Sequence, residues 1–332
     1  MLLKKDFLEK KGSVMENSRK SNSIYLARFI ALVCITCAHS SIGSGRLINS
    51  FANAGVAVFF LASGIYYRAY NVEDRIKSSK KILIPWFVFG SLTFILNSIL
   101  INEFKLINYF LWLIGYNTYL WYLTVYLITM IFFSIFSIEK SKSLQFFLIA
   151  VLFISRIMTA FFNISGAVAF LNSFNWMGFV SAGLLLSQNF DELYGLRKKY
   201  FLGLALLVLI GSIFLGIKLD DNIHYFGFTS VFYQFAWCYL ILYMTTKLEK
   251  LGVLGVILKN VGRNSLTIYL VHIPIINWIS AHLDISGILN ICISTIVVLG
   301  IYLFFSLISC LISKNQKLYN LFELLTGFIG GK

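Results

Sequence analysis

The chain has 332 residues, of which 58% are hydrophobic and only 13% are charged. Soluble globular domains carry about 25% charged residues, so this composition excludes that class and indicates a helical protein that crosses a membrane several times. Barrel strands are only about 10 residues long and alternate in polarity, so the continuous apolar runs exclude an outer-membrane barrel. The formal net charge of +14 would favour nucleic acid as the partner of a soluble protein. In a membrane protein the distribution of charge matters instead, and we expect no nucleic acid partner.

Ten apolar segments are long enough to cross the hydrocarbon core as helices, which takes about 20 residues each. They cover residues 24–42, 51–70, 82–101, 117–136, 144–162, 168–187, 200–217, 226–245, 264–281 and 287–312. The sequence therefore predicts an all-α, polytopic integral membrane protein with about ten transmembrane helices. We divide it into a basic tail (1–22), a membrane domain (23–313) and a C-terminal tail (314–332). Residues 251–262 are predicted to form a helix on the inner membrane surface.

Lys and Arg set the orientation of such a protein, because cytoplasmic connections carry an excess of them. Of the 28 Lys and Arg residues, 23 fall in tails and connections on one side of the ten segments. Three, Arg46, Lys105 and Lys218, fall on the other side. A missed or invented span would invert every later connection and destroy this division. Both termini are therefore predicted to be cytoplasmic.

The first segment carries two ionisable side chains, Arg28 and His39. In a helix they leave the same face, displaced by roughly 16 Å along the axis. An ionisable group inside a membrane costs free energy unless it faces protein or water, so each is a functional hypothesis. In the predicted orientation Arg28 lies in the inner third of the membrane and His39 near its outer end. We expect this one helix face to contact ligands from both sides of the membrane.

Two more ionisable residues lie within the segments, Arg156 and His272, and no carboxylate does. Proton-coupled and sodium-coupled transporters usually keep a membrane carboxylate, so its absence argues against that class. What remains are cations that attract anions and imidazoles that exchange protons near neutral pH. Structural interpretations stay open for all four: snorkelling to the interface for Arg28, and hydrogen bonds within the helix bundle for the others.

Five motifs follow one another along the chain. They are Arg28 and His39 separated by ten residues, GVAVFFLASGIYY (Gly55 to Tyr67), KKILIP before the third segment, LWYL (Leu120 to Leu123) and GRNSLTIYLVHIP (Gly262 to Pro274). Together they resemble acyltransferase family 3, a family of integral membrane proteins, over residues 22 to 313. By position, Arg28 and His39 match the essential pair of that family.

The resemblance implies an O-acyltransferase, most often an O-acetyltransferase, in a bacterial plasma membrane. It would move an acyl group from cytoplasmic acyl-coenzyme A, usually acetyl-coenzyme A, to a hydroxyl of a cell-surface or lipid-linked polysaccharide. A histidine that removes the proton of a sugar hydroxyl contributes roughly 10²–10⁴-fold to the rate, and we assign this role to His39. Arg28 would hold the anionic or carbonyl part of the donor. The resemblance leaves open whether the chain forms a homo-oligomer or works with glycan-synthesis partners.

Four residues of these motifs are candidates for binding the substrate or donor: Ser63, Trp121, Tyr122 and Tyr269. Arg156 and His272 join them as candidates for the same role. An aromatic belt at the membrane interface would also explain Trp121 and Tyr122.

The cations Arg75, Lys80 and Lys81 precede the third segment and are candidates for binding the coenzyme phosphates. The rule for orientation accounts for them as well. Family members often carry Arg where Lys80 and Lys81 stand, and Lys cannot form a bidentate fork with phosphate. No metal is expected, because Cys34 and Cys37 form a CxxC motif inside an apolar helix without further ligands.

Two other functions remain open. A carrier or flippase for a glycan or a lipid-linked sugar would use the same polar face as a passage, without covalent chemistry. The membrane half of a two-component synthase would need a partner protein. Loss of ester-linked acetyl with intact export of the polymer would favour the enzyme over the carrier.

Overall fold

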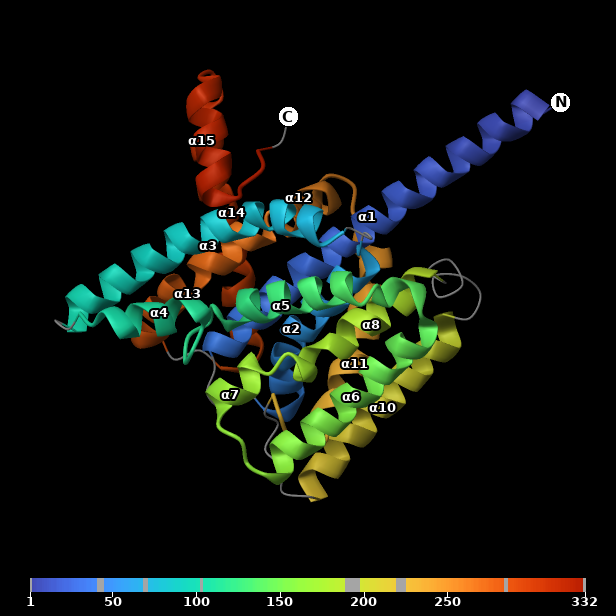
Figure 1. The fold of residues 1–332 in the computed structure, drawn as a ribbon, viewed down its shortest axis with the longest axis horizontal. Coiled ribbons are helices and arrows are strands. Elements are labelled where there is room, and N and C mark those ends of the chain that lie inside the picture. Colours follow the sequence, from blue (N-terminus) through green and yellow to red (C-terminus); the bar gives the residue numbers. More distant parts are fainter. Residues whose placement is uncertain are drawn as a thin grey trace.

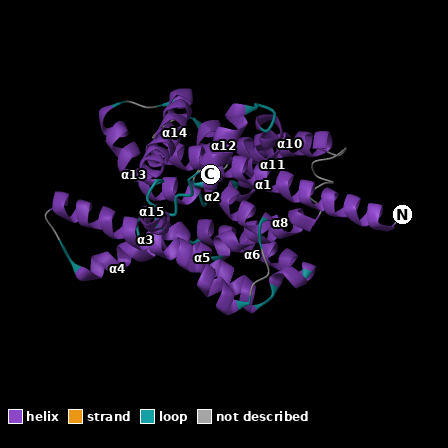
Figure 2. Ribbon diagram, turned by 90° about the horizontal axis from the view of Figure 1, so that it is seen from above, coloured by secondary structure: helices purple, strands orange, loops and turns teal. Residues whose placement is uncertain are grey.

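The computed structural model describes residues 2–40, 45–67, 71–101, 104–188, 198–218, 225–283 and 286–330, and within these ranges every regular element is a helix (Figure 2). The helices are α1 (Leu2–Ser40), α2 (Arg46–Ile65), α3 (Val72–Ile101), α4 (Leu106–Ile114), α5 (Trp121–Ile135), the 3₁₀ turn η1 (Ile138–Lys140), α6 (Lys142–Phe161), α7 (Gly166–Leu171), α8 (Phe174–Gln188), α10 (Lys198–Lys218), α11 (Ser230–Leu248), α12 (Val253–Arg263), α13 (Ser265–His282), α14 (Gly287–Ile312) and α15 (Gln316–Thr326). The predicted all-α class is confirmed.

In the described part of the chain, seven helical stretches are long and apolar enough to cross a membrane. They are Ser21–Ser40, Arg46–Ile65, Val72–Ile99, Lys142–Phe161, Gly166–Gln188, Tyr200–Lys218 and Gly287–Ile312. The chain is therefore a polytopic membrane protein, as predicted. The other three predicted segments coincide with α5, α11 and α13, which are shorter or contain more polar side chains, such as Gln234 and His272. The total of ten spans and the cytoplasmic placement of both termini stay predictions.

The apolar segment predicted over residues 168–187 is interrupted in the structure. Helix α7 ends at Leu171 and α8 begins at Phe174. The side chain of Asn172 accepts a hydrogen bond from the N–H of Phe174 (3.1 Å) and so competes with a continuous helix. Hydropathy could not reveal this break, because both pieces are apolar. The break turns α7 away from α8 and brings Phe170 to the site described below.

Helices α1 and α2 form the centre of the bundle. In each of their apolar stretches 78% of the residues are buried, against 17% for α3 and 22% for α10. Figure 1 shows α3, α4, α13 and α14 on one side of this pair and α6, α8, α10 and α11 on the other. Helix α1 contacts α2, α11, α12, α13 and α14. Arg28 and His39 therefore belong to a helix that is surrounded by protein rather than by lipid.

Helices α2 and α8 cross closely because each has a glycine where they meet. A Cβ atom at Gly64 would overlap the backbone of Val180, and one at Gly183 would overlap the carbonyl of Leu61. Small residues allow this kind of approach between membrane helices. This close contact holds Ser63, next to Gly64, beside one of the two cavities described below.

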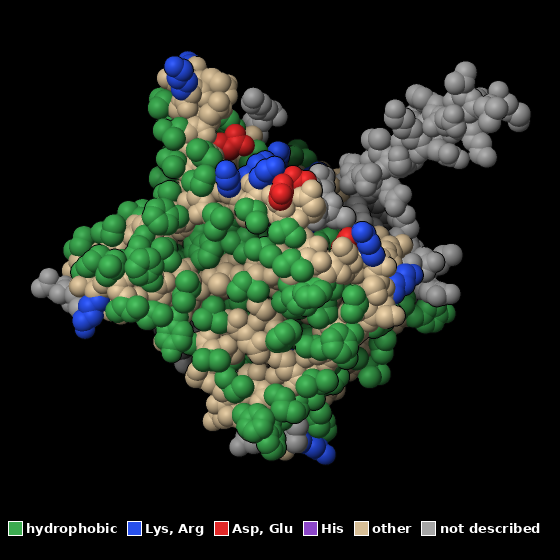
Figure 3. Space-filling view, viewed as in Figure 1, with side chains coloured by type: hydrophobic (Ala, Val, Ile, Leu, Met, Phe, Trp, Pro, Cys, Tyr) green, Lys and Arg blue, Asp and Glu red, His purple; other side chains and the backbone are tan. Residues whose placement is uncertain are grey.

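Charged side chains gather at one end of the molecule, over the start of α3 and over α12 and α15, while apolar side chains cover much of the visible surface away from that end (Figure 3). The helix predicted over residues 251–262 is present as α12, and it packs against α1. The C-terminal segment also contains a helix, α15, which packs against α3 and α14. We call the end of the molecule formed by the start of α3, α12 and α15 the charged end. The predicted orientation places this end on the cytoplasmic side.

Candidate active site

Two cavities lie inside the bundle on either side of Tyr269. The first, called the His39 cavity, has a volume of about 330 Å³, and its lining includes His39, Tyr119, Trp121, Phe170, Tyr225 and Tyr269. The second, called the Arg28 cavity, has a volume of about 170 Å³, and its lining includes Arg28, Ser63, Tyr122, Tyr126, Arg263 and Tyr269. The two ionisable side chains of α1 thus face separate chambers, and Tyr269 faces both.

Tyr269 is held in place by a reciprocal pair of hydrogen bonds. Its hydroxyl donates to the backbone carbonyl of Tyr119, and the hydroxyl of Tyr119 donates to the carbonyl of Leu270 (3.0 Å). The Tyr269 ring also packs against Tyr122, with ring centroids 5.4 Å apart. These contacts join α13 to the turn before α5. The passage expected along α1 is therefore divided by an aromatic wall.

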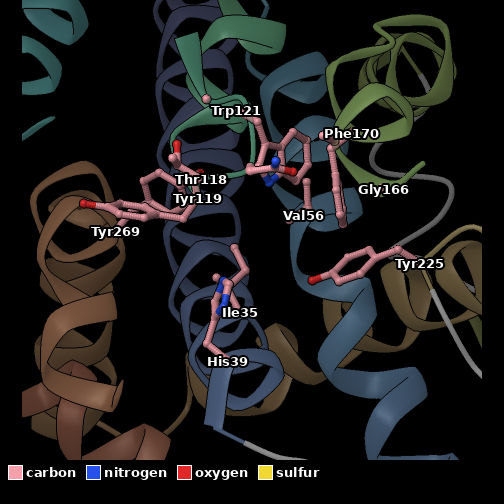
Figure 4. A pocket seen from close by; sticks show the side chains of 13 residues that line it. Ile35, His39, Val56, Thr118, Tyr119, Trp121, Gly166, Phe170, Tyr225 and Tyr269 are labelled. Carbon is pink, nitrogen blue, oxygen red and sulfur yellow. The ribbon is translucent and has the colours of Figure 1, made fainter. Parts of the chain in front are cut away.

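His39 lies in the last turn of α1, and its exposed imidazole points into the His39 cavity (Figure 4). Ile35, one turn earlier on the same face, lines the same cavity. Within the described part of the chain no hydrogen bond holds the His39 ring, so its nitrogens are available to a ligand.

The end of α1 that carries His39 is fastened to α14 by Asn290. The Asn290 side chain donates to the carbonyl of Cys37 (3.1 Å) and pairs with the hydroxyl of Ser40. Ser294, one turn further along α14, also donates to Asn290 (3.2 Å). These bonds satisfy groups that the helix end would otherwise leave unpaired, and they fix the position from which His39 projects.

Aromatic rings also line the side of the His39 cavity that lies opposite His39. Trp121 packs against Phe170 of α7, with ring centroids 4.7 Å apart, and against Trp176 of α8, at 4.9 Å. Tyr225 approaches from the opposite side, with its hydroxyl pointing toward the centre of the cavity (Figure 4). Burial raises the pKa of the Tyr225 phenol, so this hydroxyl stays protonated and can donate a hydrogen bond.

Arg156 contacts residues that pack against these rings, and it lines neither cavity. Its guanidinium donates to the carbonyl of Asn175 (3.2 Å), the carbonyl of Tyr225 and the side chain of Gln234 (3.3 Å). It also lies over the rings of Trp176, at 4.4 Å, and Phe226, at 4.5 Å. Of the two interpretations that the sequence left open, this geometry favours hydrogen bonding to carbonyls over direct contact with a substrate.

The Arg28 cavity combines two guanidinium groups, those of Arg28 and Arg263. The Nε–H of Arg28 is buried, and no acceptor in the described residues reaches it. Buried donors are almost always paired in native structures, so an unpaired one at a cavity indicates a ligand. The Ser63 hydroxyl already donates to the carbonyl of Phe59 (2.8 Å) but keeps its lone pairs for another donor. This chamber fits an anionic or carbonyl-bearing ligand.

The three cations in the first turns of α3 line neither cavity. Arg75 is buried and donates to Ser134 of α5 (3.2 Å), and its guanidinium lies 4.8 Å from the centre of the Tyr67 ring. Lys80 and Lys81 are exposed at the charged end. Their binding of a coenzyme phosphate stays a prediction.

Sequence reasoning did not assign several residues of the site, although some carried a signal. Arg263 stands in the GRNSLTIYLVHIP motif, and Asn290 is a polar residue inside an apolar span. No local signal marks Phe170 or Tyr225, because only the tertiary fold brings α7 and the segment before α11 to His39. In the described residues, no group of three or more His, Cys, Asp or Glu side chains could hold a metal ion.

The fold and the two chambers define a multi-pass membrane protein with a cationic and an imidazole-bearing cavity that share one wall. The sequence matches the acyltransferase domain of acyltransferase family 3 over residues 21–314. The chain therefore belongs to that family and is a membrane acyltransferase. Neither the curated proteins nor the solved structures give a significant match to it.

Proposed function

We propose that this protein is an O-acyltransferase of a bacterial plasma membrane that moves an acetyl group from acetyl-coenzyme A to a hydroxyl of a cell-surface or lipid-linked polysaccharide. The observation that carries the proposal is that Arg28 and His39 lie on one helix but face two chambers that meet at Tyr269. A donor and an acceptor that approach from opposite sides need this arrangement.

The donor fits the Arg28 cavity. Coenzyme A carries a diphosphate, a further phosphate and a thioester carbonyl, and guanidinium groups bind such oxygens by strong charge-assisted hydrogen bonds. Arg263 stands exposed at the end of α12, on the charged end of the molecule. In the predicted orientation this is the cytoplasmic side, where acetyl-coenzyme A is found.

The acceptor fits the His39 cavity. The apolar C–H faces of a sugar pack against aromatic rings, and its hydroxyls need polar partners nearby. Trp121 and Phe170 supply the rings, while Tyr225 and His39 supply polar groups. Ligand sites commonly combine an aromatic lining with a few such groups.

The chemistry needs a base beside the hydroxyl. His39 removes the proton as the sugar oxygen attacks the thioester carbonyl, so that a C–O bond forms and the C–S bond breaks. The proton ends on the sulfur of the departing coenzyme. The acetyl carbon must reach the His39 side of Tyr269 for this step, so the side chain of Tyr269 has to yield or the thioester has to extend past it.

The test compares the surface polysaccharide of source cells with and without the gene. Loss of ester-linked acetate that mild alkali releases, with the polymer still exported, is the expected result. Loss of surface polymer with accumulation inside the cell would instead support the exporter or flippase. Unchanged ester content would contradict the proposal.

A further inference from the structure

His272 has one ring nitrogen occupied and the other unpaired. Its Nδ1 lies 2.6 Å from the backbone carbonyl of Tyr269, one turn earlier in α13. A carbonyl only accepts, so Nδ1 carries the proton and Nε2 presents a lone pair. This Nε2 is fully buried, and no donor in the described residues reaches it. Buried polar atoms are almost always hydrogen-bonded in native structures, so the free Nε2 requires an explanation.

The ring next to His272 is that of His39. The two ring centroids lie 5.5 Å apart, with the rings tilted by 59°. Other titratable groups near the pair include the phenols of Tyr119, at 6.0 Å from the His272 ring, and Tyr269, at 5.5 Å, and the phenol of Tyr225 across the His39 cavity. From helix α14, the neutral side chains of Asn290 and Ser294 lie next to the end of α1. A histidine with an exchangeable ring proton thus stands beside an acceptor that no other donor reaches among the described residues.

We propose that His272 is a positioning residue that accepts a hydrogen bond from His39, either directly or through one water molecule. This inference rests on the proposed function. The bond would turn the protonated nitrogen of His39 toward α13 and leave its other nitrogen as a base toward the cavity. When His39 takes the hydroxyl proton, the resulting imidazolium is stabilised by the hydrogen bond that it donates to Nε2 of His272. No proton is consumed, because the one removed from the sugar passes to the thiol of the coenzyme.

The backbone carbonyl is essential to this arrangement. It holds His272 in the tautomer that accepts at Nε2, whereas a ring in the other tautomer would present a proton to His39 instead of a lone pair. The hydrogen bond at one nitrogen of a histidine sets which nitrogen is protonated. At metal sites, removing a group that orients a histidine in this way typically costs roughly 10–100-fold in affinity or activity. We expect a loss of this size from His272 variants that cannot accept.

The experiment uses the full-length protein in lipid nanodiscs, with acetyl-coenzyme A as donor and the de-esterified surface polysaccharide of the source cells as acceptor. Released thiol reports the rate. His272→Phe keeps a ring of similar size but removes the acceptor, and we expect kcat to fall by roughly 10–100-fold while KM for acetyl-coenzyme A stays unchanged. His272→Gln restores an acceptor oxygen and should recover most of that loss. The amount of folded protein is measured for each variant by size-exclusion chromatography.

His282 provides a matched control. Its Nδ1 also lies close to a backbone carbonyl, that of Trp278 at 2.8 Å, but its ring is exposed and has no neighbouring imidazole among the described residues. His282→Phe should keep the wild-type kcat. A wild-type kcat in His272→Phe would overturn the inference, as would equal losses in the Phe and Gln variants. Full activity in His39→Ala would instead contradict the proposed function, so the two failures are distinguishable.

Discussion

The two cavities on either side of Tyr269 differ in charge and in size, with volumes of about 330 Å³ for the His39 cavity and about 170 Å³ for the Arg28 cavity. The Arg28 cavity contains two guanidinium groups together with hydroxyls, whereas the His39 cavity is lined by aromatic rings and a single imidazole. One helix, α1, supplies the decisive residue of each. Charge in one cavity and rings in the other would suit the anionic donor and the neutral sugar of the proposed function.

The difference also explains why the wall between them matters. A thioester must be kept from water until the acceptor is present, and excluding water strengthens every electrostatic interaction inside a site. Tyr269 provides that separation. Its hydroxyl donates to the carbonyl of Tyr119, and the hydroxyl of Tyr119 donates to the carbonyl of Leu270.

The largest effect is expected from His39→Ala. Loss of the base should lower kcat by roughly 10²–10⁴-fold, since general base catalysis contributes that much, and KM for acetyl-coenzyme A should stay the same because the donor binds in the other chamber. Thiol release in nanodiscs measures both quantities. His282→Ala, which removes an exposed histidine at the end of α13, should behave like the wild type. A raised donor KM in His39→Ala would contradict the separation of the chambers.

Arg28→Ala should act on the opposite chamber. Hydrogen bonds to charged groups contribute about 1.5–3 kcal/mol, so binding of acetyl-coenzyme A should weaken by roughly 10-fold to 150-fold. Isothermal titration with coenzyme A measures this change without any acceptor. The double variant Lys80→Ala/Lys81→Ala removes exposed cations at the charged end. It shows whether the loss of positive charge alone weakens coenzyme binding. An equal loss in that variant would mean that the phosphates bind at the surface and not beside Arg28.

Much of this organisation was predictable from the sequence. The spacing of Arg28 and His39 places them on one helix face, and continuous apolar runs reveal most of the helices. Charge distribution predicts that the cations collect at one end, and the structure shows them there (Figure 3). These features depend on local periodicity and composition, which a single chain displays directly.

Other features depend on tertiary contacts and left no local trace. The division of the passage by Tyr269 arises because its hydroxyl meets the carbonyl of Tyr119, 150 positions earlier in the chain. The role of Arg156 is similar, since its partners come from α8, α11 and the segment before α11. Hydropathy also could not distinguish α7 from α8, because the break at Asn172 depends on one side-chain hydrogen bond.

A smaller effect is expected from Trp121→Ala. The contacts of this ring with Phe170 and Trp176 would be lost, and aromatic pairs contribute about 0.5–1.5 kcal/mol beyond their buried area. KM for the polysaccharide should rise by roughly 2-fold to 12-fold, while coenzyme binding stays unchanged. Trp278→Ala removes a tryptophan that is 66% exposed on α13 and serves as the control. A change in coenzyme binding for Trp121→Ala would show that the chambers are not independent.

The smallest effect is expected from Tyr269→Phe, which keeps the ring of the wall but removes its hydroxyl. A neutral hydrogen bond contributes about 0.5–1.5 kcal/mol, so the tie between α13 and the turn before α5 should loosen without unfolding the bundle. Turnover with the polysaccharide should change by less than about tenfold. Hydrolysis of acetyl-coenzyme A without any acceptor should rise, because water reaches the thioester more easily. Tyr200→Phe alters an 82% exposed residue of α10 and controls for the substitution itself. Hydrolysis at the wild-type level in Tyr269→Phe would mean that the ring alone separates the two chambers and that its hydrogen bond contributes nothing to the barrier.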